Sequence, residues 1–266
     1  MFLATLFQLF FDVHSWYLST WCNRPFAGRV RVLSCRLVVK RNALFGADEA
    51  DILRYIRKNT IIPVPRVILS ARGFGSTFML MEFVEGEVLE YAWRDLNEGQ
   101  RTKVIGQLRA HVMQLRSLHP PDPRAVCGLG GAACKDARLQ SYGSFGPFAA
   151  VSDFHDHLTR AATPWIDEVY LENIRRRMSD NYRVMFTHSD LAPRNIIVRG
   201  DDIAAIIDWE HAGWYPEYWE YVKALYHPMS VKDQSWNDVV KDMIPQGYEK
   251  EWKLDKEMTD HMVGAI

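Results

Sequence analysis

Four polar residues at fixed spacing constrain this 266-residue chain more than any other feature of its sequence. His188, Asp190 and Asn195 stand in the pattern H-x-D-x-x-x-x-N, and Asp208 follows thirteen positions after the asparagine. This is the spacing of a phosphoryl-transfer loop followed by a metal-binding aspartate. Any β-hairpin can carry Asp or Asn at its ends, because both residues favour turns, but that reading does not account for four positions at once.

Short apolar runs on both sides of these residues predict their local structure. The runs are rich in β-prone residues and lie at 184–187, 196–198 and 203–207. Gly200 and the two aspartates after it supply a turn between the last two runs. Asn195 then opens one strand of a hairpin and Asp208 closes the other, so we expect the two residues to lie close together.

Asn195 and Asp208 are suitable ligands for a magnesium ion. Mg²⁺ prefers hard oxygen ligands and usually takes one or two carboxylates together with phosphate oxygens and water. Asp190 then remains available to orient an acceptor hydroxyl and to take its proton.

Lys40 and Glu49 form a second predicted pair. Lys40 ends a β-prone run at 36–40, and a helical pattern follows at 47–58. Glu49 shares one face of that helix with apolar residues, so its carboxylate points toward the sheet and needs a cation. We expect Lys40 to be this partner and to hold the α- and β-phosphates of a nucleotide.

Several stretches between about 28 and 230 resemble the aminoglycoside phosphotransferase-like kinases, and in particular the fungal branch of that family. They are V-V-K-R at 38–41, E-A-D-I-L-R-Y-I at 49–56, I-P-V-P-R-V at 62–67, M-L-M-E-F-V-E-G at 79–86, G-L-G-G-A-A-C-K-D at 128–136, G-P-F at 146–148, T-H-S-D-L-A-P-R-N at 187–195 and I-I-D-W-E-H-A-G-W-Y-P-E-Y-W-E-Y at 206–221.

The resemblance implies an α+β, protein-kinase-like fold with two lobes. A small mixed β/α lobe would span 1–84 and bind the nucleotide, and a mainly helical lobe would span 85–266 and carry the catalytic loop, the metal site and the acceptor helices. The hinge between them would read adenine through the backbone of Glu82, Phe83 and Val84.

Two further residues of the loop have predicted roles. We expect His188 to brace the loop rather than react. Arg194 occupies the place that an arginine holds in the D-L-A-x-R-N order of tyrosine-kinase-like loops, and we expect it to supply positive charge near the acceptor or the γ-phosphate. The alternative is an ion pair between Arg194 and a nearby acid.

The glycine-rich phosphate loop that kinases carry is incomplete in this sequence. No G-x-G-x-x-G motif precedes Lys40, where only Gly28 stands in the stretch 23–29, and Gly73 and Gly75 come after the helix. A short phosphate loop would weaken nucleotide binding or change the preferred nucleotide.

The sequence therefore predicts an ATP-dependent kinase that phosphorylates a hydroxyl group of a small molecule. The fold also serves acceptors unrelated to antibiotics, so the sequence does not identify the acceptor. The alternative is a catalytically silent nucleotide-binding module, a pseudokinase, which the weak phosphate loop would favour. A protein kinase is disfavoured because no A-P-E segment follows Asp208, and a hydrolase because no G-x-S-x-G elbow is present.

Composition excludes several other partners. The net charge of −1 argues against nucleic-acid binding, which normally requires a basic excess. The four cysteines, at 22, 35, 127 and 134, have no zinc-site spacing, so we expect reduced thiols and a cytoplasmic protein. His155 and His157 are too close in sequence to share a metal on a helix. The oligomeric state is not predicted.

The apolar segment 2–11 ends at Asp12, well short of a membrane span. We expect it to form a helix that packs on the small lobe, with a membrane-interface anchor or a weak signal segment as the alternatives. A membrane partner is disfavoured.

The rest of the chain reads as mainly helical, with a core-facing helix at 102–118 and a long irregular segment at 119–150 that could shape the substrate opening. Acidic residues in the tail either line a pocket for a cationic ligand or lie on solvated helix faces, and we favour the faces. These acids are Glu217, Glu220, Asp238, Asp242, Glu249 and Glu251.

Overall fold

A computed structural model describes residues 2–21, 29–34, 36–43, 47–136, 144–226, 235–244 and 246–261, with only the backbone described at 13–21, 34 and 235. The first half of the chain contains α1 (Phe2–Trp21), β1 (Val30–Ser34), β2 (Leu37–Ala43), α2 (Glu49–Asn59), β3 (Val67–Gly73), β4 (Ser76–Glu82), β5 (Glu87–Val88), α3 (Leu89–Ala92), α4 (Glu98–Ser117), β6 (Cys127–Gly128) and η1 (Leu129–Gly131). The second half contains α5 (Val151–Ala161), α6 (Glu168–Arg177), β7 (Val184–Thr187), η3 (Pro193–Asn195), β8 (Ile196–Arg199), β9 (Asp202–Ile206), η4 (Trp209–His211), β10 (Gly213–Pro216), α7 (Trp219–Leu225), α8 (Ser235–Met243) and α9 (Glu249–Thr259).

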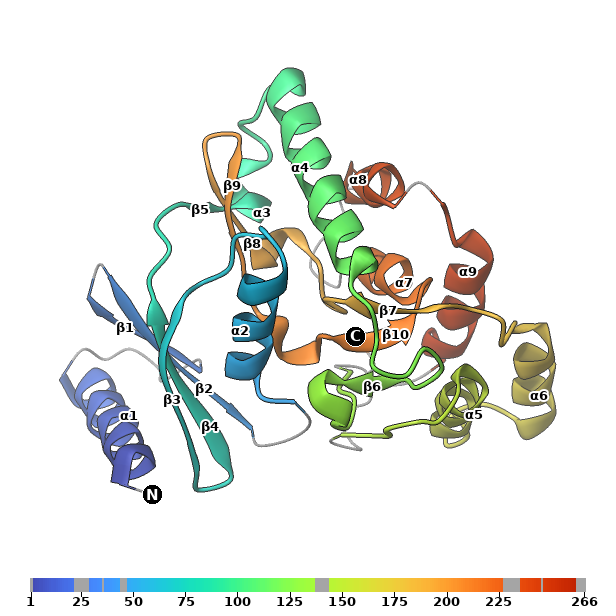
Figure 1. Ribbon diagram of the computed structural model, residues 1–266, viewed down its shortest axis with the longest axis horizontal. Helices are drawn as coiled ribbons and strands as arrows, with labels where there is room; N and C mark the ends of the chain where they lie inside the picture. The colour runs from blue at the N-terminus through green and yellow to red at the C-terminus, as the bar shows by residue number, and fades with distance from the viewer. Residues whose placement is uncertain are drawn as a thin grey trace.

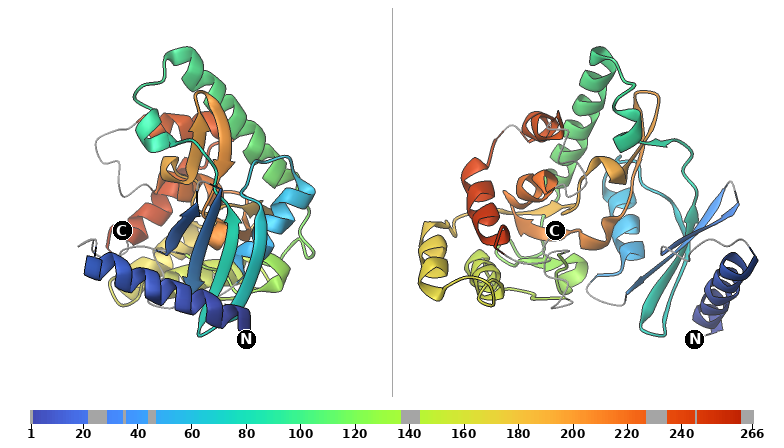
Figure 2. Two further views of the ribbon diagram at one scale, coloured as in Figure 1. Left: turned by 90° about the vertical axis from the view of Figure 1, so that its left-hand side faces the viewer. Right: turned by 180° about the vertical axis from the view of Figure 1, so that it is seen from behind.

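The described N-terminal strands form an antiparallel sheet in the order β1-β2-β4-β3. Helix α2 lies on the face of the sheet toward the helical part of the molecule, and α1 lies on the opposite face (Figures 1 and 2). Because successive residues of a strand point to opposite faces, β2 directs Lys40 toward α2 and Val39 toward α1. The sheet thus has a buried charged side and a buried apolar side.

Helix α1 packs on the sheet, as the sequence predicted. The Phe7 and Phe11 rings lie 5.8 Å and 6.1 Å from the Phe78 ring, and all three side chains are buried. The helix is longer than the apolar segment from which it was predicted, since α1 continues to Trp21. A single acid at position 12 does not end a helix, and that side chain is exposed. Nowhere in the described ranges is a helix both long and apolar enough to cross a membrane.

The helical part is built around α4, α7 and the neighbouring helices, and the two small sheets contact α4 through β7 and β9 (Figure 1). Helix α4 begins four residues before the predicted start, because Asn97 and Gln100 form a capping box. Trp209, Trp214 and Trp219 are buried in the main hydrophobic core.

Strands β8 and β9 form the predicted hairpin. Ile196 pairs with Ile206, and the backbone N–H of Ile207 donates to the carbonyl of Asn195 at 2.9 Å. Strand β7 was predicted, but its partner was not: it pairs with β10 in the sheet β6-β10-β7. The loop between β7 and η3 therefore starts from one small sheet and ends at the other.

Candidate active site

Lys40 and Glu49 make the predicted contact. The Lys40 ammonium lies 2.9 Å and 2.7 Å from the two carboxylate oxygens of Glu49, and both side chains are buried. Glu49 is held in place because it starts α2, which Asp48 caps by accepting a hydrogen bond from the backbone N–H of Ala50, and because Asn42 donates to its Oε2.

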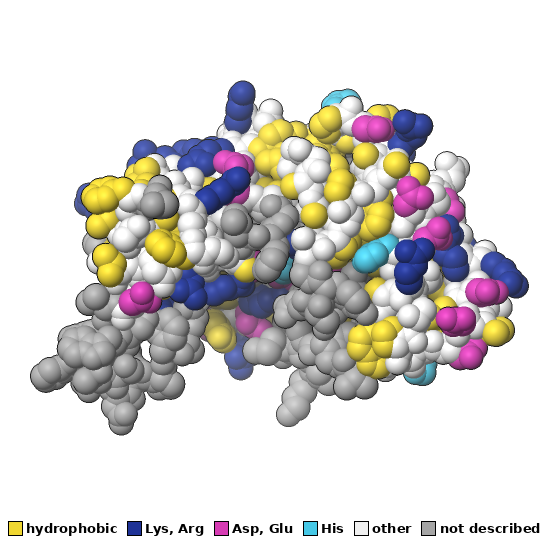
Figure 3. Space-filling view, turned by 90° about the horizontal axis from the view of Figure 1, so that it is seen from below, with side chains coloured by type: hydrophobic (Ala, Val, Ile, Leu, Met, Phe, Trp, Pro, Cys, Tyr) yellow, Lys and Arg dark blue, Asp and Glu magenta, His cyan; other side chains and the backbone are white. Residues whose placement is uncertain are grey.

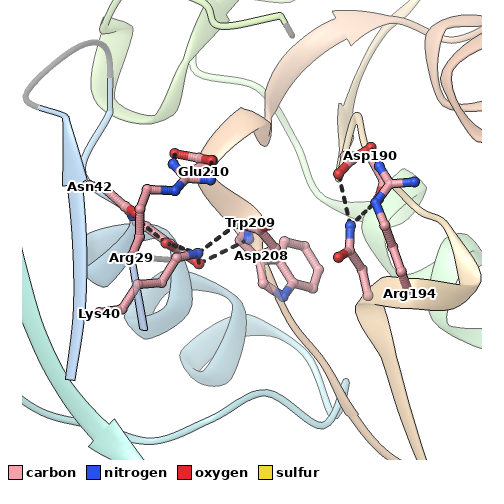
Figure 4. Close-up of polar contacts among 10 residues, drawn as sticks. Arg29, Lys40, Asn42, Asp190, Arg194, Asp208, Trp209 and Glu210 are labelled. Atoms are coloured by element: carbon pink, nitrogen blue, oxygen red, sulfur yellow. Dashed lines mark hydrogen bonds and ion pairs between the residues drawn. The ribbon is translucent and has the colours of Figure 1, made fainter. Parts of the chain in front are cut away.

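Lys40 also contacts Asp208, and this contact joins the N-terminal sheet to the helical part. Its Nζ lies 2.6 Å from Oδ1 of Asp208, and the N–H of Trp209 donates to Glu49 at 3.1 Å (Figure 4). Asp208 has φ = 64°, in the left-handed region that Asp tolerates better than most residues. This turn after β9 directs the carboxylate to the ammonium.

The charges of this cluster shift each other's pKa values. Burial would raise the pKa of Asp208, but the Lys40 ammonium outweighs it and lowers the pKa to about 2. Burial would likewise lower the pKa of Lys40, but Glu49 and Asp208 hold it above its ordinary value. The lysine is therefore a fixed cation and Asp208 a fixed anion at neutral pH.

Asp190 lies on the other side of Trp209 from this cluster (Figure 4). Its Oδ1 accepts from Arg194 at 2.5 Å, and its Oδ2 accepts from Nδ2 of Asn195 at 2.8 Å. The backbone of Asn195 lies beside that of Asp208, because the Asn195 carbonyl accepts from the N–H of Ile207. The side-chain amide of Asn195, however, points to Asp190. Arg194, expected near an acceptor or phosphate, is bonded to the carboxylate of Asp190.

His188 has the bracing position that was expected. It is fully buried, and burial lowers its pKa to about 4, so the ring is neutral. The N–H of Asp190 donates to Nδ1 at 3.2 Å, which leaves the proton on Nε2 to be donated to the carbonyl of Ile207 at 3.0 Å. The histidine therefore ties the loop to the residue before Asp208.

Glu220 was not predicted as part of the site, and the interpretation of this residue as a solvated helix acid is wrong. Its side chain is buried, and its carboxylate accepts from the backbone N–H of His188 at 2.5 Å and of Ser189 at 3.2 Å. Ser189 has φ = 65°, so the loop turns sharply where the glutamate holds it. Glu220 lies in the first turn of α7. Its carboxylate oxygens pair with N–H groups of the loop that are buried and would otherwise have no hydrogen-bond acceptor.

The predicted hinge lines a pocket beside the Lys40 cluster. The pocket has a volume of about 290 Å³ and is lined by Arg29, Val30, Val32, Val38, Lys40, Glu49, Leu53, Pro65, Met81, Glu82, Phe83, Val84, Ile197, Ile207 and Asp208. Apolar side chains form most of its walls. The charged groups of Arg29, Lys40, Glu49 and Asp208 lie together, and Glu82 lies at the hinge. Strand β4 ends at Glu82, two residues before the predicted end, so Phe83 and Val84 lie in the connection that follows.

Arg29 and Glu210 are two more charged residues that sequence reasoning missed. Arg29 precedes β1, Glu210 lies in η4, and their side chains form an ion pair with distances of 2.8 Å and 2.6 Å (Figure 4). Seen from below, charged side chains of both signs lie in the hollow between the part that carries the N-terminal sheet and the helical part (Figure 3). The position of Glu210 two residues after Asp208 was a usable signal, whereas nothing in the sequence marked Arg29.

The other predicted features can be placed briefly. The irregular segment 119–150 contains Asp136, which forms a buried ion pair of 3.0 Å with Lys223. Residues 137–143 of this segment lie outside the described residues. Within the described part of the chain no cluster of three metal-binding side chains occurs, and His155 bonds Asp180 and Tyr218 instead. Cys127 and Cys134 are buried free thiols, whereas Cys22, Cys35 and the stretch containing Gly28 lie outside the described residues.

The antiparallel sheet, the helical part and the buried lysine between two carboxylates define a protein with a protein-kinase-like fold. The sequence profile of the phosphotransferase enzyme family matches residues 27–252. The chain belongs to this family, and the predicted fold class is confirmed.

Solved structures of aminoglycoside phosphotransferases show the same fold. One in a ternary complex with ADP and hygromycin B has 15% identity and a TM-score of 0.56, over 90% of this chain and 81% of its own. An aminoglycoside-3'-phosphotransferase of type VIII has 18% identity and a TM-score of 0.53, over 84% and 85%. One from Streptomyces rimosus, in complex with ADP and streptomycin, has 14% identity and a TM-score of 0.51, over 95% and 98%. None of the curated proteins compared with the chain matches its sequence.

Proposed function

We propose that this phosphotransferase transfers the γ-phosphoryl group of ATP to a hydroxyl group of a small molecule. The observation that carries the proposal is the contact of the Lys40 ammonium with both Glu49 and Asp208, at the charged end of an apolar pocket. The apolar walls suit a purine ring, and the charged end suits a triphosphate. Backbone groups of Glu82, Phe83 and Val84 would contact the base.

We assign the metal site to Asn195 and Asp208. Both hydrogen bonds from Nδ2 of Asn195 go to Asp190, so its Oδ1 faces away from that residue, and Asp208 uses Oδ1 for the lysine and keeps Oδ2. One amide oxygen and one carboxylate oxygen fit Mg²⁺, which takes its other ligands from phosphates and water. The bound ion would neutralise charge on the phosphates.

Asp190 would take the proton in the transfer step. The acceptor oxygen attacks the γ-phosphorus, the bond from that phosphorus to the bridging oxygen of ADP breaks, and the hydroxyl proton moves to the Asp190 carboxylate. Arg194 and Asn195 fix the orientation of this carboxylate through their hydrogen bonds. His188 and Glu220 hold the loop that carries it.

We further propose a division into two lobes at 84/85, membership of the fungal branch of the family, and a cytoplasmic location. The buried free thiols of Cys127 and Cys134 support the location, because disulfide bonds are rare in reducing compartments. The identity of the acceptor stays open, since 14–18% identity to aminoglycoside phosphotransferases supports the fold alone.

Titration with nucleotide followed by an acceptor panel tests the proposal. ATP with Mg²⁺ should raise the melting temperature of the wild type, and a panel of alcohols, sugars and aminoglycosides should contain a compound that receives labelled γ-phosphate. Asp190→Asn should still bind ATP and should transfer no phosphate above about 1% of the wild-type rate.

The alternative is a catalytically silent nucleotide-binding module. It is favoured by the missing G-x-G-x-x-G motif and by the engagement of both Asp190 oxygens with Arg194 and Asn195. Nucleotide binding without transfer to any acceptor supports this alternative. A protein that binds no nucleotide contradicts both.

A further inference from the structure

Arg29 lines the pocket and forms an ion pair with Glu210. Both nitrogens of the arginine fork contact the carboxylate, at 2.8 Å and 2.6 Å. The two partners come from opposite sides, one from the start of β1 and one from η4 in the helical part. The arginine side chain is 51% exposed, whereas that of Glu210 is only 9% exposed, so the guanidinium can leave more easily than the carboxylate.

The backbone places Arg29 beside the residue that is expected to hold phosphate. Val30 pairs with Lys40 in the β1-β2 ladder, and the carbonyl of Arg29 accepts from the N–H of Arg41 at 2.7 Å. Arg29 lines the pocket together with Lys40 and Asp208, and the charges of Asp208 and Glu49 help to raise its pKa. The arginine therefore lies beside the charged groups that would face the phosphates.

Carboxylates outnumber the lysines around Arg29. The Lys40 ammonium is shared between Glu49 and Asp208, Glu210 adds a third carboxylate, and Lys135 interacts electrostatically with Glu210 and Glu49. Without Arg29, these two lysines and three carboxylates have a net charge of −1, which would repel a triphosphate. In many kinases backbone N–H groups of a glycine-rich loop offset such charge, but the motif for that loop is missing here.

We propose that Arg29 is a phosphate-binding residue, which Glu210 holds in the absence of nucleotide. A guanidinium presents its N–H donors in a planar fork that fits two phosphate oxygens as well as it fits a carboxylate. ATP therefore competes with Glu210 for the arginine, and the exchange takes the place of contacts that a glycine-rich motif would supply. This inference rests on the proposed function.

Binding of adenosine and of ATP, measured by calorimetry in EDTA to exclude metal effects, tests the role. Arg29→Met should weaken ATP binding about 10- to 100-fold and leave adenosine binding unchanged, since only the phosphates lose a partner. Arg29→Lys, which keeps the charge without the fork, should lose less. Glu210→Gln should bind ATP about 2- to 5-fold more tightly, because a half-exposed ion pair no longer competes.

Arg54→Met is the matched control, because Arg54 is 46% exposed and pairs with Asp51 in the same sheet-and-helix unit but outside the pocket. It should bind both ligands like the wild type. Arg29→Met with unchanged ATP affinity overturns the inference and leaves the proposed function intact, and an equal loss for adenosine and ATP overturns it as a structural effect. A wild type that binds neither ligand, in EDTA or with Mg²⁺, contradicts the proposed function itself.

Discussion

Substitution of Glu220 by glutamine should destabilise the protein at low pH more than at high pH. The carboxylate accepts two buried backbone N–H groups, from His188 and Ser189. A glutamine side chain has one acceptor oxygen, so one N–H loses its partner and meets an amide NH₂ group instead. Leaving a buried donor unpaired costs about 1–3 kcal/mol of unfolding free energy.

The pH dependence follows from the raised pKa of the wild-type residue. Burial raises the pKa of Glu220 to about 7, from an ordinary value of 4.5, against the opposing effect of the two N–H groups and Arg116. As pH rises between these values, the unfolded chain loses this proton while the folded protein keeps it, so stability falls. The loss by pH 8 is about 3 kcal/mol, at about 1.4 kcal/mol per tenfold change in proton affinity. Glutamine does not titrate and avoids this loss.

Urea unfolding, followed by tryptophan fluorescence from about pH 5 to about pH 8, measures the effect. The free energy of unfolding of the wild type relative to Glu220→Gln should decrease by about 3 kcal/mol over this range. Glu172→Gln is the control, since Glu172 is 65% exposed on α6, and its difference from the wild type should stay within about 0.5 kcal/mol. The reasoning would be refuted if the difference in unfolding free energy between the wild type and Glu220→Gln were the same at every pH.

Three further substitutions test the site and the packing of α1. Asp190→Asn should lower kcat by about 10²- to 10⁴-fold without changing the dissociation constant of ATP, as measured by steady-state kinetics and calorimetry; a retained kcat would exclude a proton-accepting role. Lys40→Met leaves the buried Glu49 and the partly buried Asp208 without their cation and should cost about 3–5 kcal/mol of stability in urea unfolding, and an unchanged midpoint would contradict these contacts. Phe78→Ala should cost about 3–5 kcal/mol, whereas Phe74→Ala, at a ring that is 63% exposed, should cost less than about 0.5 kcal/mol; similar costs would disprove the α1 interface.

The parts of the site that were predicted depend on local sequence. Asn195 and Asp208 flank two apolar runs joined by Gly200, whose φ of 62° is the turn conformation that glycine adopts readily. Lys40 and Glu49 are nine positions apart, on a strand and the helix that follows it. In both cases the register of a single hairpin or helix face places the side chains, so the spacing alone was informative.

The parts that were missed depend on contacts between distant segments. Glu220 meets backbone N–H groups more than thirty residues away, and the periodicity of α7 does not reveal that its first turn faces a loop. Arg29 and Glu210 are 181 positions apart. Strand β3 was not predicted because most of its residues are only partly buried, so it lacks a clear alternation of apolar and polar positions.

Helix α1 covers an apolar face of the N-terminal sheet that would otherwise be exposed to water. The family profile begins at residue 27, yet the outer side of the sheet is completed by Ala4, Phe7 and Phe11 from the preceding helix. A piece trimmed to the family boundaries would present Val39 and Phe78 as a bare aromatic and aliphatic surface, prone to self-association. We therefore expect the folding unit of this chain to include α1, which lies outside the range that the family profile matches.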